Sequence, residues 1–191
     1  MLFRSENNPP GKTGPYVAYR QIPDEVLDAA FDRWWPTDFQ IHMHMNGDAA
    51  ADQALSAIRK AVAKHGARDH RPVFVHATSL RDDQIAAVKE FGAVPSFLTS
   101  GLLPGGDAVV TMWGRERASN AMATRTMLAE GIPFTFSHDA PVSPEPWILT
   151  LVDCGVNRRT PSGNVIGPDQ RIAPYDALRA VTAMAAYQLK E

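Results

Sequence analysis

Four short strand patterns, each followed by a helical pattern, constrain the fold of this chain more than any other feature. Apolar residues at helical spacing, with Gly and Pro stops, distinguish the helices from the strands. The strands are predicted at residues 39–45, 72–77, 94–98 and 133–139, and the helices at residues 24–35, 48–65, 80–91, 115–130, 147–156 and 174–189, with a loop at 99–106. This alternation implies parallel strands joined by right-handed crossovers, so the expected class is α/β.

The first predicted strand carries unusual side chains. Alternation places Met43 and Met45 on one face and His42 and His44 on the other. Parallel strands that are buried on both faces usually read as continuous apolar runs. Two imidazoles on one face therefore need a role, and the inside of a barrel near its open end would suit them.

Composition excludes several classes of protein. The chain has 191 residues, of which 45% are hydrophobic and 21% are charged. Its net charge of −2 does not favour binding to nucleic acid or to an anionic membrane. The single cysteine, Cys154, allows no internal disulfide. No apolar run approaches the roughly 20 residues of a membrane span, and the first residues lack a signal-peptide core, so we expect a cytoplasmic protein.

Potential metal ligands lie at or near the ends of three predicted strands, namely His44, His76 and Asp139. In a parallel sheet these ends meet at one edge, where the sites of such folds lie. Two histidines and a carboxylate suit Zn²⁺ or another divalent ion, and the carboxylate could instead accept a proton from a metal-bound water. A single strand-end histidine is more often structural, and an Asp in this setting often only forms a turn, so the spacing leaves both interpretations open.

Four further polar residues are candidates for supporting roles. His42 shares a face with His44, and the pair could also form a two-histidine clamp by itself. Asp48 fits the N-cap of the following helix, or it could orient a ligand imidazole. Arg158 and Arg171 could grip a substrate carboxylate, although exposed arginines are more often simply solvated.

Several segments together resemble the amidohydrolase superfamily, in its amidohydrolase-family-3 branch. They include His44-Met-Asn-Gly-Asp-Ala-Ala50, Val75-His76-Ala77, Ser137-His-Asp-Ala-Pro-Val142 and Ala177-Leu-Arg-Ala-Val-Thr182. The resemblance covers nearly all of the chain from about Gly14 onward.

This resemblance implies a TIM (β/α)8 barrel with one or two divalent ions at its carboxyl rim. It also implies a small-molecule substrate and hydrolysis of a non-peptide C–N amide-type bond by metal-activated water. His44, His76 and Asp139 would be the ligands of strands five, six and eight, with Asp139 also the general base.

The same resemblance makes residues 23–191 the carboxyl-terminal half of such a barrel, with parallel strands five to eight and flanking helices, after an irregular arm at residues 1–22. A full barrel takes about 250 residues, and the family's histidine pair of strand one has no counterpart here. A half-barrel exposes two sheet edges, so we expect two copies to associate or a missing amino-terminal half to bind. The alternative function is a non-catalytic half-barrel that serves as an interaction or scaffold module.

Overall fold

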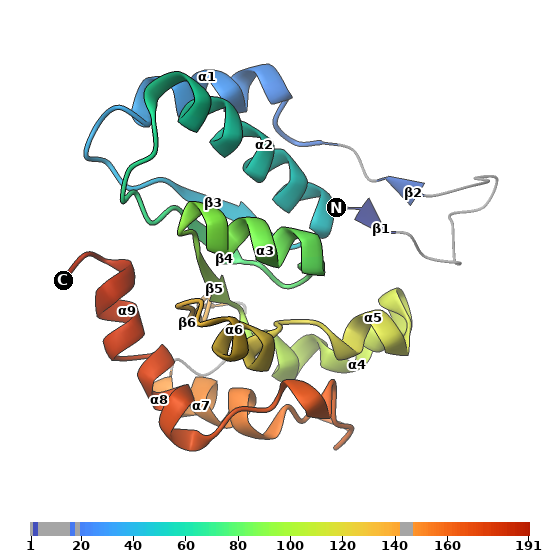
Figure 1. The fold of residues 1–191 in the computed structure, drawn as a ribbon. Coiled ribbons are helices and arrows are strands. Elements are labelled where there is room, and N and C mark those ends of the chain that lie inside the picture. The colour runs from blue at the N-terminus through green and yellow to red at the C-terminus, as the bar shows by residue number, and fades with distance from the viewer. Residues whose placement is uncertain (1, 4–15, 18–19, 142–146) are drawn as a thin grey trace.

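Four parallel strands form the centre of the molecule (Figure 1). The structure is a computed structural model that describes residues 2–3, 16–17, 20–141 and 147–191. The strands are β3 (His42–Met45), β4 (Val73–His76), β5 (Val94–Phe97) and β6 (Thr135–Phe136), and they neighbour one another in sequence order. Each neighbouring pair is parallel, which confirms the predicted α/β class and is consistent with part of a (β/α) barrel.

Helices flank the sheet and fill the connections between its strands (Figure 1). They are α1 (Asp24–Trp34), α2 (Asp48–His65), α3 (Asp82–Phe91), α4 (Leu102–Trp113), α5 (Arg115–Ser119), α6 (Thr124–Glu130), α7 (Ile148–Asn157), α8 (Pro174–Ala180) and α9 (Ala183–Gln188). Two short 3₁₀ turns, η1 (Thr99–Gly101) and η2 (Pro168–Gln170), complete the connections.

The predicted irregular arm at residues 1–22 contains one antiparallel pair of two-residue strands, β1 (Leu2–Phe3) and β2 (Tyr16–Val17). Residues 1, 4–15 and 18–19 lie outside the described residues, as do residues 142–146. The division of the chain at residue 22 therefore stays a prediction.

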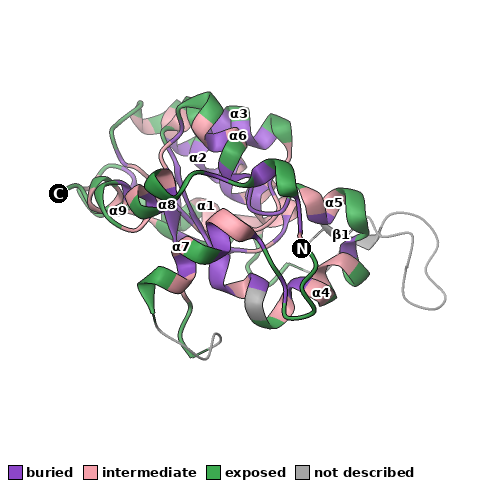
Figure 2. Ribbon diagram, turned by 90° about the horizontal axis from the view of Figure 1, so that it is seen from below, coloured by how far each residue is buried: buried purple, intermediate pink, exposed green. Residues whose placement is uncertain are grey.

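The predicted alternation of β3 is confirmed by burial. Met43 and Met45 are buried, whereas His42 and His44 are exposed. The buried side lies against α2, which turns Ala51, Leu55 and Ile58 into the core. Buried residues, purple in Figure 2, gather on the strands and on the inner sides of the helices. One face of β3 is thus core, and the face with both imidazoles is open.

Helix α4 replaces the loop that was predicted at residues 99–106. Its segment contains Pro104 and two glycines, which have low helix propensity. Tertiary packing outweighs that propensity, because Leu102 and Trp113 are buried and Gly106 lies against Thr160. A Cβ on Gly106 would lie 2.6 Å from Cγ2 of Thr160, so this close approach requires a glycine.

Strand β6 is shorter than predicted, and the helix predicted at residues 115–130 is divided into α5 and α6. The backbone bonds of β6 continue only to Ser137, whose N–H donates to the carbonyl of Phe97. Beyond it, Asp139 has a φ of +56°, which is not extended backbone. The carbonyls of Ala121 and Met122, between α5 and α6, accept hydrogen bonds from Arg158 instead of continuing a helix.

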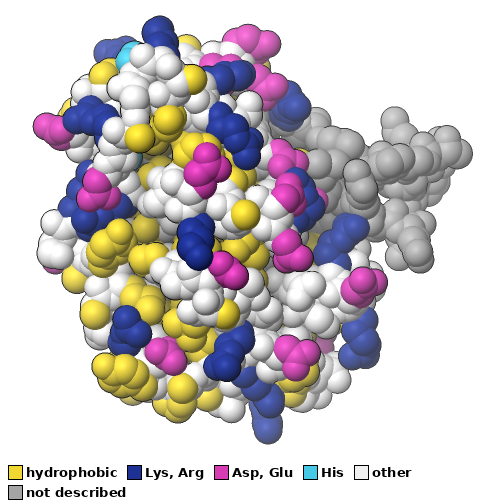
Figure 3. All heavy atoms as spheres, viewed as in Figure 1, with side chains coloured by type: hydrophobic (Ala, Val, Ile, Leu, Met, Phe, Trp, Pro, Cys, Tyr) yellow, Lys and Arg dark blue, Asp and Glu magenta, His cyan; other side chains and the backbone are white. Residues whose placement is uncertain are grey.

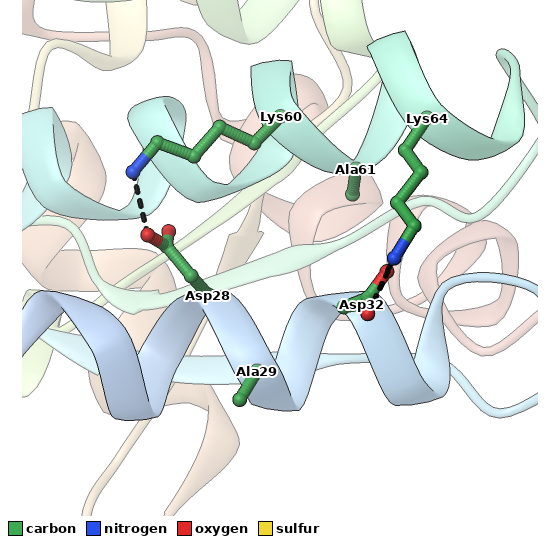
Figure 4. A pocket seen from close by; sticks show the side chains of 6 residues that line it. All are labelled: Asp28, Ala29, Asp32, Lys60, Ala61 and Lys64. Carbon is green, nitrogen blue, oxygen red and sulfur yellow. Dashed lines mark hydrogen bonds and ion pairs between the residues drawn. The ribbon is translucent and has the colours of Figure 1, made fainter.

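Ion pairs hold α1 against α2. Nζ of Lys60 donates to Asp28, and Nζ of Lys64 donates to Asp32, at N–O distances of 2.5 and 2.8 Å (Figure 4). Small side chains between these pairs leave a hollow of about 260 Å³. Because each lysine is already paired with a carboxylate, this hollow is a helix–helix contact and offers no free cation to a ligand.

The end of α9 links the two edges of the sheet. The backbone carbonyl of Gln188 accepts a hydrogen bond of 2.6 Å from Gln40, which precedes β3. Its side-chain oxygen accepts one of 2.7 Å from Thr135 in β6. One residue of α9 therefore contacts segments at both edge strands and ties them together.

Among the residues described, no helix combines the length and apolar character that crossing a bilayer requires.

Candidate functional site

His44 and His76 meet at the carboxyl edge of the sheet. His44 is the third residue of β3 and His76 is the last residue of β4, the neighbouring strand. Their ring centroids are 4.5 Å apart and the ring planes stand at 87° to one another. His76 is buried, whereas His44 is exposed. Two members of the predicted ligand set are therefore adjacent, and their role as metal ligands stays a prediction.

The direction of the His76 ring depends on an unusual backbone conformation. In the register of the sheet His76 pairs with Met45, which is buried on the helix-covered side, whereas His44 pairs with Val75. Regular alternation would therefore put the two histidines on opposite faces. His76 instead has a φ of +74°, and Ala77 after it has a φ of +43°. Such values are uncommon for residues other than glycine and tend to occur at functional sites.

Asp139 reaches the same edge from the far side of β5. Its Oδ2 lies 3.7 Å from Nε2 of His76, within ion-pair range but longer than a hydrogen bond. Its φ of +56° turns the chain out of the direction of β6. The η1 turn supports this segment, because Oγ of Ser100 donates to the carbonyl of His138. His76 thus contacts both other members of the predicted ligand set.

The three residues are neighbours in pairs but not a closed ligand shell. Within the described ranges, no group of three or more His, Cys, Asp or Glu side chains is arranged to hold a metal ion. The edge-to-face contact of the two rings and the 3.7 Å gap from His76 to Asp139 account for this. Zn²⁺ requires its nitrogen and oxygen ligands at about 2.0–2.2 Å, so binding would require small rotations of these side chains.

Burial keeps His76 in the form that a metal ligand needs. Desolvation is the main cause that lowers the pKa of the His76 imidazole, and the nearby His44 lowers it further, while Asp139 acts in the opposite direction. At neutral pH the ring is therefore uncharged and keeps a lone pair. Its Nδ1 is buried without a hydrogen-bond partner in the described part of the chain. A buried ring nitrogen without a partner fits a group that would accept its lone pair.

His42 lies two residues before His44 on β3, and is therefore further from the carboxyl edge of the sheet. Its Nε2 is 2.9 Å from Oε1 of Gln40, and partial burial lowers the pKa of its imidazole. Since both rings lie on the exposed face of β3, the face assignment is confirmed. The bond to Gln40 favours an orienting role, so a metal clamp of His42 with His44 remains a prediction.

The predicted N-cap role of Asp48 is wrong by one residue. Gly47 occupies the N-cap position of α2, and Asp48 is the first residue of the helix. Its Oδ1 accepts a hydrogen bond from the backbone N–H of Ala49, and its Oδ2 lies 3.5 Å from Nη1 of Arg81. The carboxylate therefore interacts favourably with the dipole of α2 and contacts Arg81. These contacts do not direct it toward a histidine.

Arg158 is not available to a substrate, which corrects the prediction of a substrate-binding role. The residue is fully buried, with 0% of its surface exposed. Nε donates to the carbonyl of Ile166, and the two Nη atoms donate to those of Met122 and Ala121, at 2.6 to 3.1 Å. Burial is the main cause that lowers the pKa of this guanidinium to about 10. Arg158 thus joins three segments of the fold.

Arg171 is exposed, and its guanidinium donates twice to the carbonyl of Asn157 at 3.2 and 3.0 Å. Asn157 is the last residue of α7, so the positive charge of Arg171 there interacts favourably with the dipole of this helix. A substrate role for Arg171 remains a prediction.

Sequence reasoning missed a polar cluster behind the two histidines. Arg81 contacts three carboxylates, and Gln84 is almost completely buried beside it. The order Arg81-Asp-Asp-Gln84 gave a signal, because Gln at the third position of a helix commonly closes a capping arrangement. The backbone N–H of Arg81 does donate to Oε1 of Gln84, at 3.0 Å.

A parallel sheet with flanking helices and a histidine pair at its carboxyl edge is typical of enzymes built on (β/α) barrels. Comparison with known proteins agrees with this class. A model of the amidohydrolase family matches residues 7–191, and the chain belongs to that family.

Three relatives illustrate the similarity. The putative amidohydrolase YtcJ of Bacillus subtilis (strain 168) is 24% identical over 171 residues, which are 85% of this chain and 31% of YtcJ. A solved structure of an uncharacterized metal-dependent hydrolase from Pyrococcus furiosus has a TM-score of 0.73 and 26% identity, covering 88% of this chain and 33% of its own. The corresponding Pyrococcus horikoshii OT3 structure has a TM-score of 0.74 and 25% identity, with 88% and 34% covered. The chain therefore spans about a third of the length of these relatives.

Proposed function

We propose that this chain contributes to a metal-dependent amidohydrolase that cleaves a non-peptide C–N amide-type bond in a small molecule. The observation that carries the proposal is the contact between His44 and His76 at the carboxyl edge of the sheet, with Asp139 3.7 Å from His76. The family assignment and the similarity to metal-dependent hydrolases support it.

The side chains present fit a divalent ion in kind. Two imidazoles and a carboxylate are common ligands of Zn²⁺, and Nε2 of His76 is the ring nitrogen that lies near Asp139. His44 and His76 would hold the ion through ring nitrogens, and Asp139 would hold it or accept a proton at its carboxylate. When bound, such an ion supplies a water whose pKa is lowered to about 7. The family resemblance admits one or two ions.

The residues of this site would also keep a ligand nitrogen uncharged, leave access for a small molecule and limit the rotation of a histidine ring. The uncharged state of His76 keeps its lone pair available at neutral pH. The exposure of Asp139 and His44 leaves the carboxyl edge accessible to a small molecule. The hydrogen bond that Nε2 of His42 donates to Oε1 of Gln40 limits the rotation of the ring next to His44 on the same face.

Zinc titration followed by an assay tests this proposal. Purified protein is titrated with Zn²⁺ by calorimetry, and hydrolysis of a panel of N-acyl amides is then measured with the ion present. We expect saturable binding in the wild type and none in the His44→Ala/His76→Ala double variant. Equal binding by both proteins would contradict the proposed site.

We also propose that the four strands act as strands five to eight of a barrel and associate with four more, supplied by a second copy of this chain or by a separate amino-terminal half. Within the described residues nothing pairs with the outer edge of β3. Exposed apolar side chains also gather over α7 to α9 (Figure 3); they include Ile148, Leu149, Tyr175, Leu178 and Leu189. Light scattering at micromolar protein should give twice the mass of 20.9 kDa if the partner is a second copy. A monomer would exclude that partner.

A non-catalytic half-barrel that serves as a scaffold is the second candidate function. The absence of a closed three-ligand group in the described part of the chain favours it. The two functions differ in what the histidines do. If the wild type binds no Zn²⁺ and hydrolyses no amide, while it and the double histidine variant fold and associate alike, the scaffold function is favoured.

A further inference from the structure

Arg81 occupies the point where the loops that follow the two histidine strands come together. The loop after β3 runs from the end of the strand at Met45 to the start of α2, and the loop after β4 runs from His76 to the start of α3. Arg81 immediately precedes α3 and is its N-cap residue. Contacts between these two loops therefore influence how far apart the histidines are held.

The guanidinium of Arg81 uses each of its five N–H donors. It bonds both carboxylate oxygens of Asp52 on α2, at 2.7 and 3.1 Å. It bonds both oxygens of Asp83 on α3, at 3.0 and 2.9 Å, and Nη1 reaches Asp48 at 3.5 Å. A planar fork with five donors can make this set of contacts, whereas the compact ammonium of a lysine cannot.

Gln84 adds a second, buried link between the same helices. Its exposed surface is only 1%, so each polar atom needs a partner. Nε2 donates to the backbone carbonyl of Asp48 and to Oδ1 of Asp52, at 2.6 and 2.7 Å. Oε1 accepts from the backbone N–H of Arg81. The amide therefore directs these three hydrogen bonds to the start of α2 and the start of α3.

Further hydrogen bonds join the two loops between this cluster and the strand ends. Oγ1 of Thr78 donates to Oδ1 of Asn46 at 3.2 Å, and the N–H of Ser79 donates to the carbonyl of Asn46 at the same distance. Next to the strands, the N–H of Ala77 donates to the carbonyl of Met45 at 2.9 Å. The two loops are thus joined at successive points from the histidine pair to Arg81.

We propose that Arg81, supported by Gln84, is a positioning residue that fixes the spacing of His44 and His76 by holding the starts of α2 and α3 together. This inference rests on the proposed metal-dependent function, but the positions of the two rings can be measured in the metal-free protein. Arg81 contacts neither imidazole; it acts through Asp48, Asp52 and the two loops. A role limited to general stability would leave the ring environments unchanged.

The test compares Arg81→Gln and Arg81→Lys with the matched control Lys89→Gln. Lys89 is on the same helix and joins α3 to α6 through an ion pair of 3.0 Å with Glu130. The readouts are the imidazole NMR signals of the metal-free proteins, the Zn²⁺ dissociation constant and the melting temperature. Arg81→Lys keeps the charge, and it provides a folded comparison if Arg81→Gln does not fold.

We expect both Arg81 variants to shift the ring signals of His44 and His76 while the signal of His65 stays in place, and Lys89→Gln to shift none of the three. Zn²⁺ binding should weaken about tenfold or more in the Arg81 variants, as is typical when a group that orients metal ligands is lost. Unmoved signals of His44 and His76 in the folded Arg81→Lys variant would overturn the inference. If the wild type binds no Zn²⁺, the proposed function fails, and the ring signals still decide the positioning role.

Discussion

Nε2 of His76 and Oδ2 of Asp139 lie 3.7 Å apart, although His76 ends β4 and Asp139 follows β6, and these strands are not neighbours in the sheet. Neighbouring strands are about 4.8 Å apart, so side chains from β4 and β6 meet only if both lean across the end of β5. The positive φ values of His76 and Asp139 allow this approach. The candidate site therefore depends on two local departures from regular strand geometry.

Replacing His76 by Ala should weaken Zn²⁺ binding by more than about 100-fold, because loss of a group that only orients a ligand already weakens binding about 10- to 100-fold. Calorimetric titration measures the change. His65→Ala is the control, since His65 bonds Asp32 between α1 and α2, away from the strand ends. A similar loss in both variants would indicate a general effect on folding.

Replacing Arg158 by Met should destabilise the fold by about 3 kcal/mol or more, because three buried carbonyl groups lose their donor. Arg171→Met removes an exposed guanidinium and should change stability by less than about 1 kcal/mol. Urea unfolding of both variants measures the difference. An Arg158 variant of normal stability that instead raised KM would restore the substrate-binding role that the structure argues against.

Replacing Gly155 by Ala should destabilise the chain by about 1–3 kcal/mol, because an added Cβ would lie 2.6 Å from Cζ of the buried Phe136 ring. Gly105→Ala, also within a helix, is the matched control: a Cβ there meets nothing within 4 Å, and alanine favours helix. Thermal unfolding should show a lower melting temperature for the first variant and an equal or higher one for the second.

The carboxylate of Asp107 should make the contact between α4 and residues 160–164 sensitive to acid. Hydrogen bonds from Ser162, Thr160 and Asn164 lower the pKa of Asp107 to about 2 from its ordinary value of 3.8. A group whose pKa is lowered in the folded state adds stability that is present above pH 3.8 and is lost as pH falls toward 2.

The stability difference between the wild type and Asp107→Asn should therefore be largest near neutral pH and should shrink below pH 3.8. Urea unfolding at several pH values measures it, with Glu116→Gln on the neighbouring α5 as the control. A difference that stays constant down to pH 2 would contradict a role for the ionised carboxylate.

Local patterns in the sequence determined the order of strands and helices and the faces of β3. Burial in β3 alternates with a period of two: Met43 and Met45 are buried, and His42 and His44 are exposed. The strand geometry itself imposes this alternation on successive side chains. Parallel pairing then follows from the length of each crossover, and pairing brings strand ends to one edge. The sequence therefore predicted that the ends of the strands that carry His44 and His76 meet at one edge, but not that the two rings face each other.

Tertiary structure alone decided the rest. The direction of the His76 ring depends on a left-handed backbone at one residue, and the burial of Arg158 depends on the carbonyls of Ile166 and of Met122, the second 36 residues away. Helix α4 forms where glycine and proline predict a loop, because residues near Thr160 pack against it. The burial of Arg158 and the formation of α4 depend on contacts between parts of the chain that are far apart in sequence, and local periodicity carries no information about such contacts.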